Sequence, residues 1–154
     1  MSSAEPHIYR TMVVREGTLP PARCQNPREV LPVIIKTLEG CDVLGKEYFG
    51  VLYLSSRWHV IGAEIVSIGC LTATTVHPRE VFRGAVALPC CAIVLFHNHP
   101  SGDPEPSAED LSLTRRLAAG GSLLGIEVLD HIVVAKALEG GEWKLISMKD
   151  RGVL

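Results

Sequence analysis

The sequence predicts an α/β domain in which helices flank a mixed β-sheet. Stretches with helical hydrophobic spacing alternate along the 154 residues with short runs rich in β-branched and aromatic residues. Hydrophobic residues make up 47% and charged residues 21%, as in ordinary globular proteins, and the length fits a single core. We therefore expect one domain over residues 27–154, preceded by an N-terminal arm of residues 1–26 without clear periodicity.

The first half of this domain is expected to form a helix and a β-hairpin. Asn26 can cap a helix over residues 27–39, in which Pro27 occupies the first position and the hydrophobic residues share one face. Residues 47–54 and 59–69 have strand composition, and the four residues between them are typical of a hairpin turn. These two strands should therefore pair antiparallel.

The second half is expected to add two helices and three strands. The helices are predicted over Pro78–Leu88, which Pro89 stops, and over Ser107–Leu117. The continuously apolar run Cys91–Phe96 suits a strand buried on both faces and ends directly before His97. The remaining strands are predicted over residues 126–134 and 143–146, separated by a turn at Gly140-Gly141. The expected order is α-β-β-α-β-α-β-β.

Composition and charge argue against several classes of protein. The net charge of -2 gives no basic excess to attract nucleic acid. The longest uncharged runs, 65–77 and 84–96, hold 13 residues each, whereas a membrane span needs roughly 20 apolar residues. The N-terminus has no apolar core of a secretory signal, so we expect a cytoplasmic protein without a membrane partner. Five cysteines without C-x-x-C spacing predict reduced thiols rather than disulfides or a cysteine zinc site.

The chemistry of the chain is concentrated at His97, His99 and Asp110. Side chains two residues apart on a strand project to the same side, so the two imidazoles can converge on one ion. Asp110 lies near the start of the predicted helix, where its carboxylate can turn back across the short loop of residues 100–106. Three nitrogen and oxygen ligands with an open fourth position are typical of catalytic zinc, which lowers the pKa of bound water to about 7.

Simpler interpretations of the same residues remain open. Ser107-x-x-Asp110 also matches a capping box that opens a helix, a role compatible with metal binding. A single histidine at a strand end is usually a surface or hydrogen-bonded residue, although a pair is harder to dismiss. The zinc deaminase pattern P-C-x-x-C is not matched, because Pro89-Cys90-Cys91 lacks a cysteine three residues after Cys90. The letters H-N-H at residues 97–99 do not by themselves indicate a nuclease.

The motifs closely resemble those of the RadC family, the bacterial branch of JAMM (MPN-type) domains. His97-x-His99 followed by Ser107-x-x-Asp110 matches the JAMM pattern H-x-H-x(7)-S-x-x-D. The stretches VHPREVF (76–82), HNHPSGDPEPS (97–107) and LDHIVV (129–134) also read like RadC sequence, and the likeness covers about residues 27–148. The resemblance implies a single-domain JAMM/MPN fold, related to cytidine deaminases, and a zinc-dependent peptidase or isopeptidase mechanism acting on a peptide or protein.

The resemblance also implies a role for each residue of the motif. His97, His99 and Asp110 would bind Zn²⁺, and Ser107 would donate a hydrogen bond to the oxyanion of a tetrahedral intermediate. Glu47, at the start of the first predicted strand, would be the general base, with Glu64 of the second strand as the alternative.

Adjacent strand residues point to opposite faces, so Asp130 and His131 are interpreted as structural, linking a buried histidine to a neighbouring loop.

Two other functions remain as alternatives. Typical RadC proteins carry a helix-hairpin-helix segment before this domain, whereas only the arm precedes it here, so we expect no DNA-binding contribution from such a segment. A DNA-metabolism accessory protein is thus one alternative, and a non-catalytic metal-binding scaffold is the other. A short strand at Ile8–Val14 could pair across a homodimer.

Overall fold

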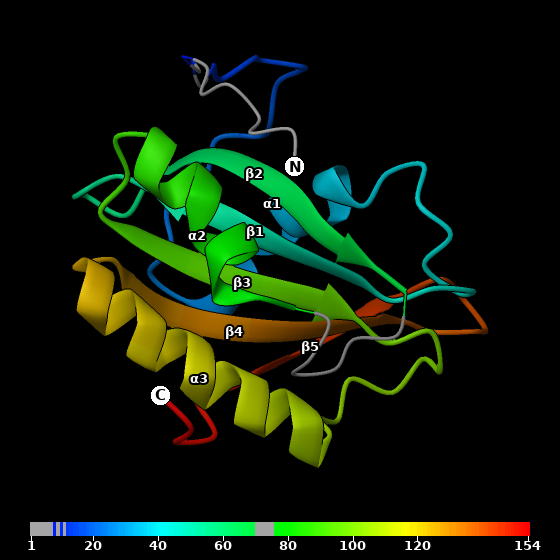
Figure 1. Ribbon diagram of the computed structural model, residues 1–154. Helices are drawn as coiled ribbons and strands as arrows, with labels where there is room; N and C mark the ends of the chain where they lie inside the picture. Colours follow the sequence, from blue (N-terminus) through cyan, green and yellow to red (C-terminus); the bar gives the residue numbers. More distant parts are fainter. Residues whose placement is uncertain (1–7, 9, 11, 70–75) are drawn as a thin grey trace, which may run out of the picture.

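A computed structural model describes residues 8, 10, 12–69 and 76–154 of the chain. It contains a five-stranded sheet with the strand order β2-β1-β3-β4-β5 (Figure 1). The elements are α1 (Pro27–Thr37), β1 (Tyr48–Leu54), β2 (Val60–Ile68), α2 (Pro78–Ala87), β3 (Ala92–Asn98), α3 (Ala108–Leu124), β4 (Glu127–Lys136) and β5 (Trp143–Ser147). Their order is the predicted one, and the α/β class with a single mixed sheet is confirmed.

The sheet is mixed because one of its connections crosses over. The pairs β1–β2, β1–β3 and β4–β5 are antiparallel, and β3 and β4 are parallel. Parallel neighbours need a long connection, which the 17-residue helix α3 supplies. This crossover sets the N-terminus of α3 near the end of β3 at which the motif histidines lie.

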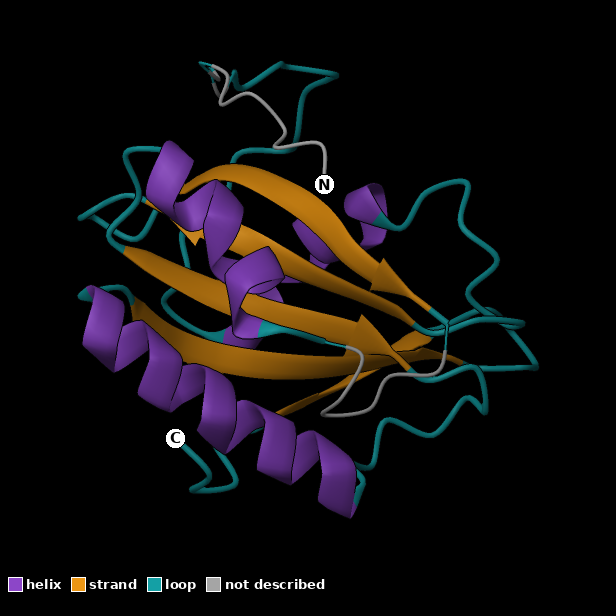
Figure 2. Ribbon diagram, viewed as in Figure 1, coloured by secondary structure: helices purple, strands orange, loops and turns teal. Residues whose placement is uncertain are grey.

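Helices cover both faces of the sheet (Figure 2). One apolar cluster combines α1 with Val94 and Phe96 of β3, and a second combines α2 and α3 with Ile93 and Leu95. Neighbouring residues of β3 thus alternate between the two clusters, as a strand buried on both faces requires. Continuing this alternation places the side chain of His97 on the same face as α2 and α3.

The third helix is longer than predicted. It continues past Leu117 to Leu124 and ends at Gly125, whose φ of 69° is the left-handed conformation that commonly terminates a helix. Gly121 lies within it because the helix packs closely there: a Cβ at this position would overlap the carbonyl oxygen of Ile126. None of the helices in the described part of the chain has both the length and the hydropathy to cross a membrane.

Ordered packing begins earlier than the predicted boundary at residue 27. Cys24 is buried, its backbone N–H donates to the Trp58 carbonyl at 2.8 Å, and the Val60 N–H donates to the Ala22 carbonyl at 2.9 Å. The end of the arm therefore pairs beside the start of β2. The strand predicted at Ile8–Val14 includes residues 9 and 11, which lie outside the described residues, and none of its described residues belongs to a strand.

The described cysteines are free thiols, as the sequence predicts. They are Cys24, Cys41, Cys90 and Cys91, and Cys70 lies outside the described residues. Burial raises the pKa of the Cys24 thiol to about 11, which keeps this thiol protonated and unreactive at neutral pH.

Candidate metal centre

The two motif histidines lie at the end of β3 and converge. His97 is only 1% exposed, and the backbone N–H of His99 donates to the Val134 carbonyl at 2.9 Å, continuing the strand pairing just beyond β3. Their side chains consequently project to the same side, and their Nε2 atoms are 3.0 Å apart. The structure thus brings the imidazoles together as the i, i+2 spacing predicts.

Asp110 completes the cluster from the first turn of α3. Ser107 is the N-cap: its Oγ accepts from the Asp110 N–H at 3.1 Å, and its own N–H donates to Asp110 Oδ2 at 2.8 Å. Asp110 Oδ1 lies 3.2 Å from His97 Nε2, and Asp110 Oδ2 lies 3.2 Å from His99 Nε2. The capping box therefore does not compete with the cluster, because it aims the Asp110 carboxylate at the histidines.

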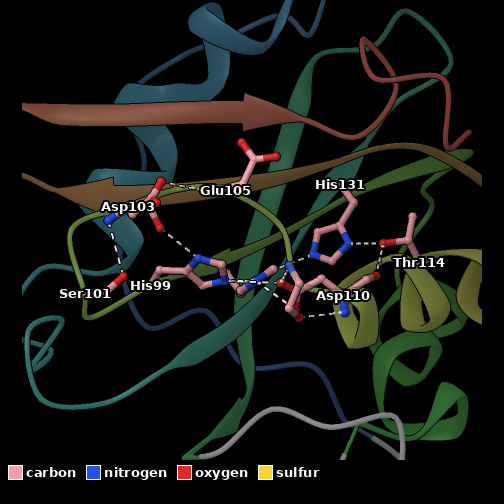
Figure 3. Close-up of polar contacts among 9 residues, drawn as sticks. His99, Ser101, Asp103, Glu105, Asp110, Thr114 and His131 are labelled. Atoms are coloured by element: carbon pink, nitrogen blue, oxygen red, sulfur yellow. Dashed lines mark hydrogen bonds and ion pairs between the residues drawn. The ribbon is translucent and has the colours of Figure 1, made fainter.

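The loop between β3 and α3 fixes the orientation of His99 (Figure 3). His99 Nδ1 lies 2.9 Å from the carbonyl oxygen of Asp103. A carbonyl can only accept, so Nδ1 must carry a hydrogen, and in the neutral imidazole Nε2 then presents its lone pair to Asp110. The loop itself is anchored by Glu105, which accepts two hydrogen bonds from Arg151 at 3.1 and 3.0 Å.

The cluster is a group of acceptors gathered in a small space. One ligand atom from each of His97, His99 and Asp110 lies within 4.8 Å of the others, so the three could hold a metal ion. Burial raises the pKa of Asp110, but hydrogen bonds with both histidines outweigh burial and leave this pKa well below its usual range. The hydrogen bond to Asp110 raises the pKa of His99. Positive charge between these side chains, from protons or a cation, is thus favoured.

Glu47 lies beside this cluster, directly before β1. The antiparallel pairing of β1 with β3 ends at Phe49 and His97, and Glu47 precedes Phe49 by two residues. The Phe49 ring stacks on the His97 ring at a centroid distance of 6.2 Å, which places Phe49 on the cluster's face of the sheet. Glu47 also contributes, after the larger effect of Asp110, to the raised pKa of His99. Glu47 therefore lies within electrostatic reach of the cluster.

The alternative carboxylate, Glu64, has other partners. It lies in β2 opposite Val51, accepts from the Tyr53 hydroxyl at 2.6 Å and pairs with Arg83 at 3.5 Å. Burial, followed by this bond to Glu64, raises the pKa of Tyr53. These contacts bind Glu64 to β1 and α2.

Asn98, between the two histidines, is a buried residue that the sequence analysis did not consider. It faces away from the cluster, where its Oδ1 accepts from the Tyr48 N–H at 2.7 Å. Its Nδ2 donates to the carbonyls of Val43 and Lys46, each at 2.9 Å. The Asn98 side chain thereby ties the segment that leads into Glu47 to the end of β3.

Asp130 and His131 face opposite sides of β4, as expected from their adjacency. Asp130 accepts from Ser147 Oγ at 2.6 Å and from the Lys149 N–H at 3.1 Å, which is a structural link to the turn after β5. His131 is instead in contact with the cluster, since its Nε2 lies 2.8 Å from His97 Nδ1. Burial lowers the pKa of His131 well below its usual range, so this ring is neutral. Its contact with the cluster is an addition to the predicted site.

Comparison with known proteins identifies the family. The family model described as "RadC-like JAB domain" matches residues 24–153. UPF0758 proteins of Desulfitobacterium hafniense and Shouchella clausii are 43% and 41% identical over 129 and 140 residues, covering 84% and 91% of this chain and 53% and 57% of theirs. One from Methanosarcina mazei is 47% identical over 107 residues, 70% of this chain and 44% of its own.

The comparison with these relatives identifies a family but no activity. Their name, UPF0758 protein, states no reaction, and this chain spans about half of their length. The matched region contains the whole capping box and both motif histidines. The extent of the family match and the identity to these relatives together show that the chain belongs to the RadC-like JAB domain family.

Proposed function

We propose that this protein is a zinc-dependent hydrolase of amide bonds, with Zn²⁺ held by His97, His99 and Asp110. The observation that carries the proposal is the chemistry of the three inward-facing groups. The Nε2 atom of neutral His99 and the carboxylate oxygens of Asp110 are acceptors 3.2 Å apart, and His97 Nε2 lies equally close to Asp110. Such groups repel one another unless a proton or a cation lies between them, and two imidazoles with a carboxylate suit a catalytic zinc site.

The surrounding residues fit hydrolysis. A bound zinc ion would supply a Lewis acid that lowers the pKa of water to about 7. The Glu47 carboxylate, which acts electrostatically on His99, would accept the proton of the attacking water and deliver it to the leaving amine. Ser107 uses an oxygen lone pair to accept from Asp110 N–H, so its hydroxyl hydrogen is still able to donate to the oxyanion of the substrate.

The substrate class and the setting are part of the same proposal. We assign the amide bond to a peptide or protein, because the motif resemblance points to the JAMM type of peptidase and the net charge of -2 does not favour nucleic acid. The free thiols of the described cysteines support a reducing compartment, the cytoplasm. A homodimer through the N-terminal arm stays a prediction.

The test pairs metal binding with peptide cleavage. The zinc-loaded protein is incubated with a peptide library, and cleavage is detected by mass spectrometry. Glu47→Gln is expected to retain one equivalent of zinc and to lose cleavage, by about 100-fold or more for a general base. Glu64→Gln is the matched control and should still cleave. Wild-type cleavage by Glu47→Gln, or loss of cleavage only in Glu64→Gln, would refute the role given to Glu47.

A further inference from the structure

A chain of buried polar contacts leads from the candidate metal centre into the core. His97 Nδ1 lies 2.8 Å from His131 Nε2. His131 Nδ1 in turn lies 2.6 Å from the hydroxyl of Thr114 on α3, a contact drawn in Figure 3. The Thr114 hydroxyl in turn donates to the backbone carbonyl of Asp110 at 2.6 Å. Thr114 and His131 are 0% exposed and His97 is 1% exposed, so solvent does not supply alternative partners.

The hydrogens along this chain can be assigned one after another. The carbonyl of Asp110 can only accept, so the single hydrogen of the Thr114 hydroxyl points to it. Thr114 Oγ1 must then accept from His131, which places a hydrogen on His131 Nδ1. The two partners of the His131 ring, a hydroxyl and an imidazole, carry no negative charge, so a doubly protonated ring would be a buried cation without an anion in hydrogen-bond contact with it. His131 Nε2 is therefore an acceptor.

Because His131 Nε2 is an acceptor, it determines which tautomer His97 adopts. The short contact requires a hydrogen on His97 Nδ1, which in the neutral ring leaves a lone pair on Nε2. Nε2 is the atom of His97 that faces Asp110 and His99. His99 adopts the same tautomer because its Nδ1 donates a hydrogen bond to the Asp103 carbonyl oxygen. The two imidazoles thus present equivalent atoms although one is oriented by a surface loop and the other by the core.

We propose that Thr114 and His131 are positioning residues that hold His97 in the tautomer with hydrogen on Nδ1, so that its Nε2 is preset to bind the metal ion. The inference rests on the proposed function, because it assumes that His97 is a ligand. Outer partners of this kind typically change metal affinity by about 10- to 100-fold when they are removed. Thr114 acts from a helix and His131 from a strand, so the orientation of His97 is tied to the packing of α3 against β4.

The first experiment measures tautomers in the metal-free protein. Long-range ¹H–¹⁵N correlation spectra of chelator-treated protein distinguish imidazole nitrogens that carry hydrogen from those that do not. We expect His131 with hydrogen on Nδ1 and none on Nε2. Hydrogen on Nε2 of His131 would overturn the inference, because the ring would then donate to His97 rather than accept from it. This readout requires neither zinc nor a substrate.

The second experiment measures zinc affinity by competition with a chromophoric chelator. Thr114→Val removes the hydroxyl at nearly constant volume and should weaken zinc binding by about 10- to 100-fold. Thr114→Ser keeps the hydroxyl and should bind like wild type. Ser147→Ala is the matched control, because it deletes another buried hydroxyl with a 2.6 Å hydrogen bond, to Asp130, outside the chain of contacts. It should leave zinc affinity unchanged.

The outcomes separate this inference from the proposed function. Wild-type protein that fails to bind zinc would refute the metal centre itself. Wild-type protein that binds zinc, together with a folded Thr114→Val variant of equal affinity, would refute only the positioning role. A Ser147→Ala variant that loses as much affinity as Thr114→Val would also refute it, because general destabilisation would then explain both losses.

Discussion

Replacing Asp110 separates its two roles, since the residue both caps α3 and faces the histidines. Asp110→Asn removes the charge but keeps an oxygen that can accept from the Ser107 N–H, a bond of 2.8 Å in the structure. Asp110→Ala removes the acceptor as well. In metal-free protein both variants lose the charge that His97 and His99 stabilise, so both should be less stable than wild type. Ala should cost about 1 kcal/mol more through the lost cap.

Metal affinity should follow a different order. Both variants lose the charged member of the three proposed ligands. Both should therefore bind zinc more than about 100-fold more weakly than wild type, a change in binding free energy of about 2.7 kcal/mol. Urea denaturation in the presence of a chelator gives the stabilities, and chelator competition gives the affinities. Wild-type zinc affinity in Asp110→Asn would refute the assignment of Asp110 as a ligand. Equal stability of the Asn and Ala variants would refute its capping role.

Three further predictions concern the support of the site and the core. Gly50→Ala should destabilise the protein by about 1–3 kcal/mol in urea denaturation, because a Cβ at this position would overlap the ring of Phe96. Unchanged stability would contradict this close approach of Phe96 to Gly50. Asn98→Ser should accelerate amide hydrogen exchange at Tyr48, whose N–H donates to the Asn98 side chain at 2.7 Å, and an unchanged exchange rate would contradict that bond. Burial of Cys24 raises its pKa from 9.0 to about 11, so the folded chain keeps a proton that the unfolded chain loses, and stability should fall by roughly 1–2 kcal/mol between pH 9 and 11. Cys24→Ala should flatten this part of a pH series of denaturation midpoints, and an equal slope in that variant would contradict the assignment.

The parts of the fold and site that sequence predicts are those fixed by local geometry. The i, i+2 spacing of His97 and His99 on a strand and the Ser107-x-x-Asp110 cap each depend on a few consecutive residues. The predicted end of the third helix at Leu117 was wrong, because the helix continues through Gly121, whose lack of a side chain permits the close approach to β4.

The contacts missed by the sequence analysis depend on strand pairing over long distances. His131 meets His97 because β3 and β4 are parallel neighbours, in a register that sets Leu95 opposite His131. Asn98 reaches residues 43–48 only through the antiparallel pairing of β1 with β3. Neither register can be read from periodicity, which gives the faces of a strand but not its partner. The electrostatic effect of Glu47 on His99 likewise depends on contacts between distant segments, and in the sequence only the motif resemblance indicated it.

The most direct test of the central claim is the metal content of protein purified without added metal, measured by inductively coupled plasma mass spectrometry. About one equivalent of zinc per chain is expected for the wild type, and much less for a His97→Ala, His99→Ala double variant that still folds. A wild-type chain that retains no metal and takes up no Zn²⁺ when it is supplied would contradict the metal centre, and so would a double variant that retains a full equivalent.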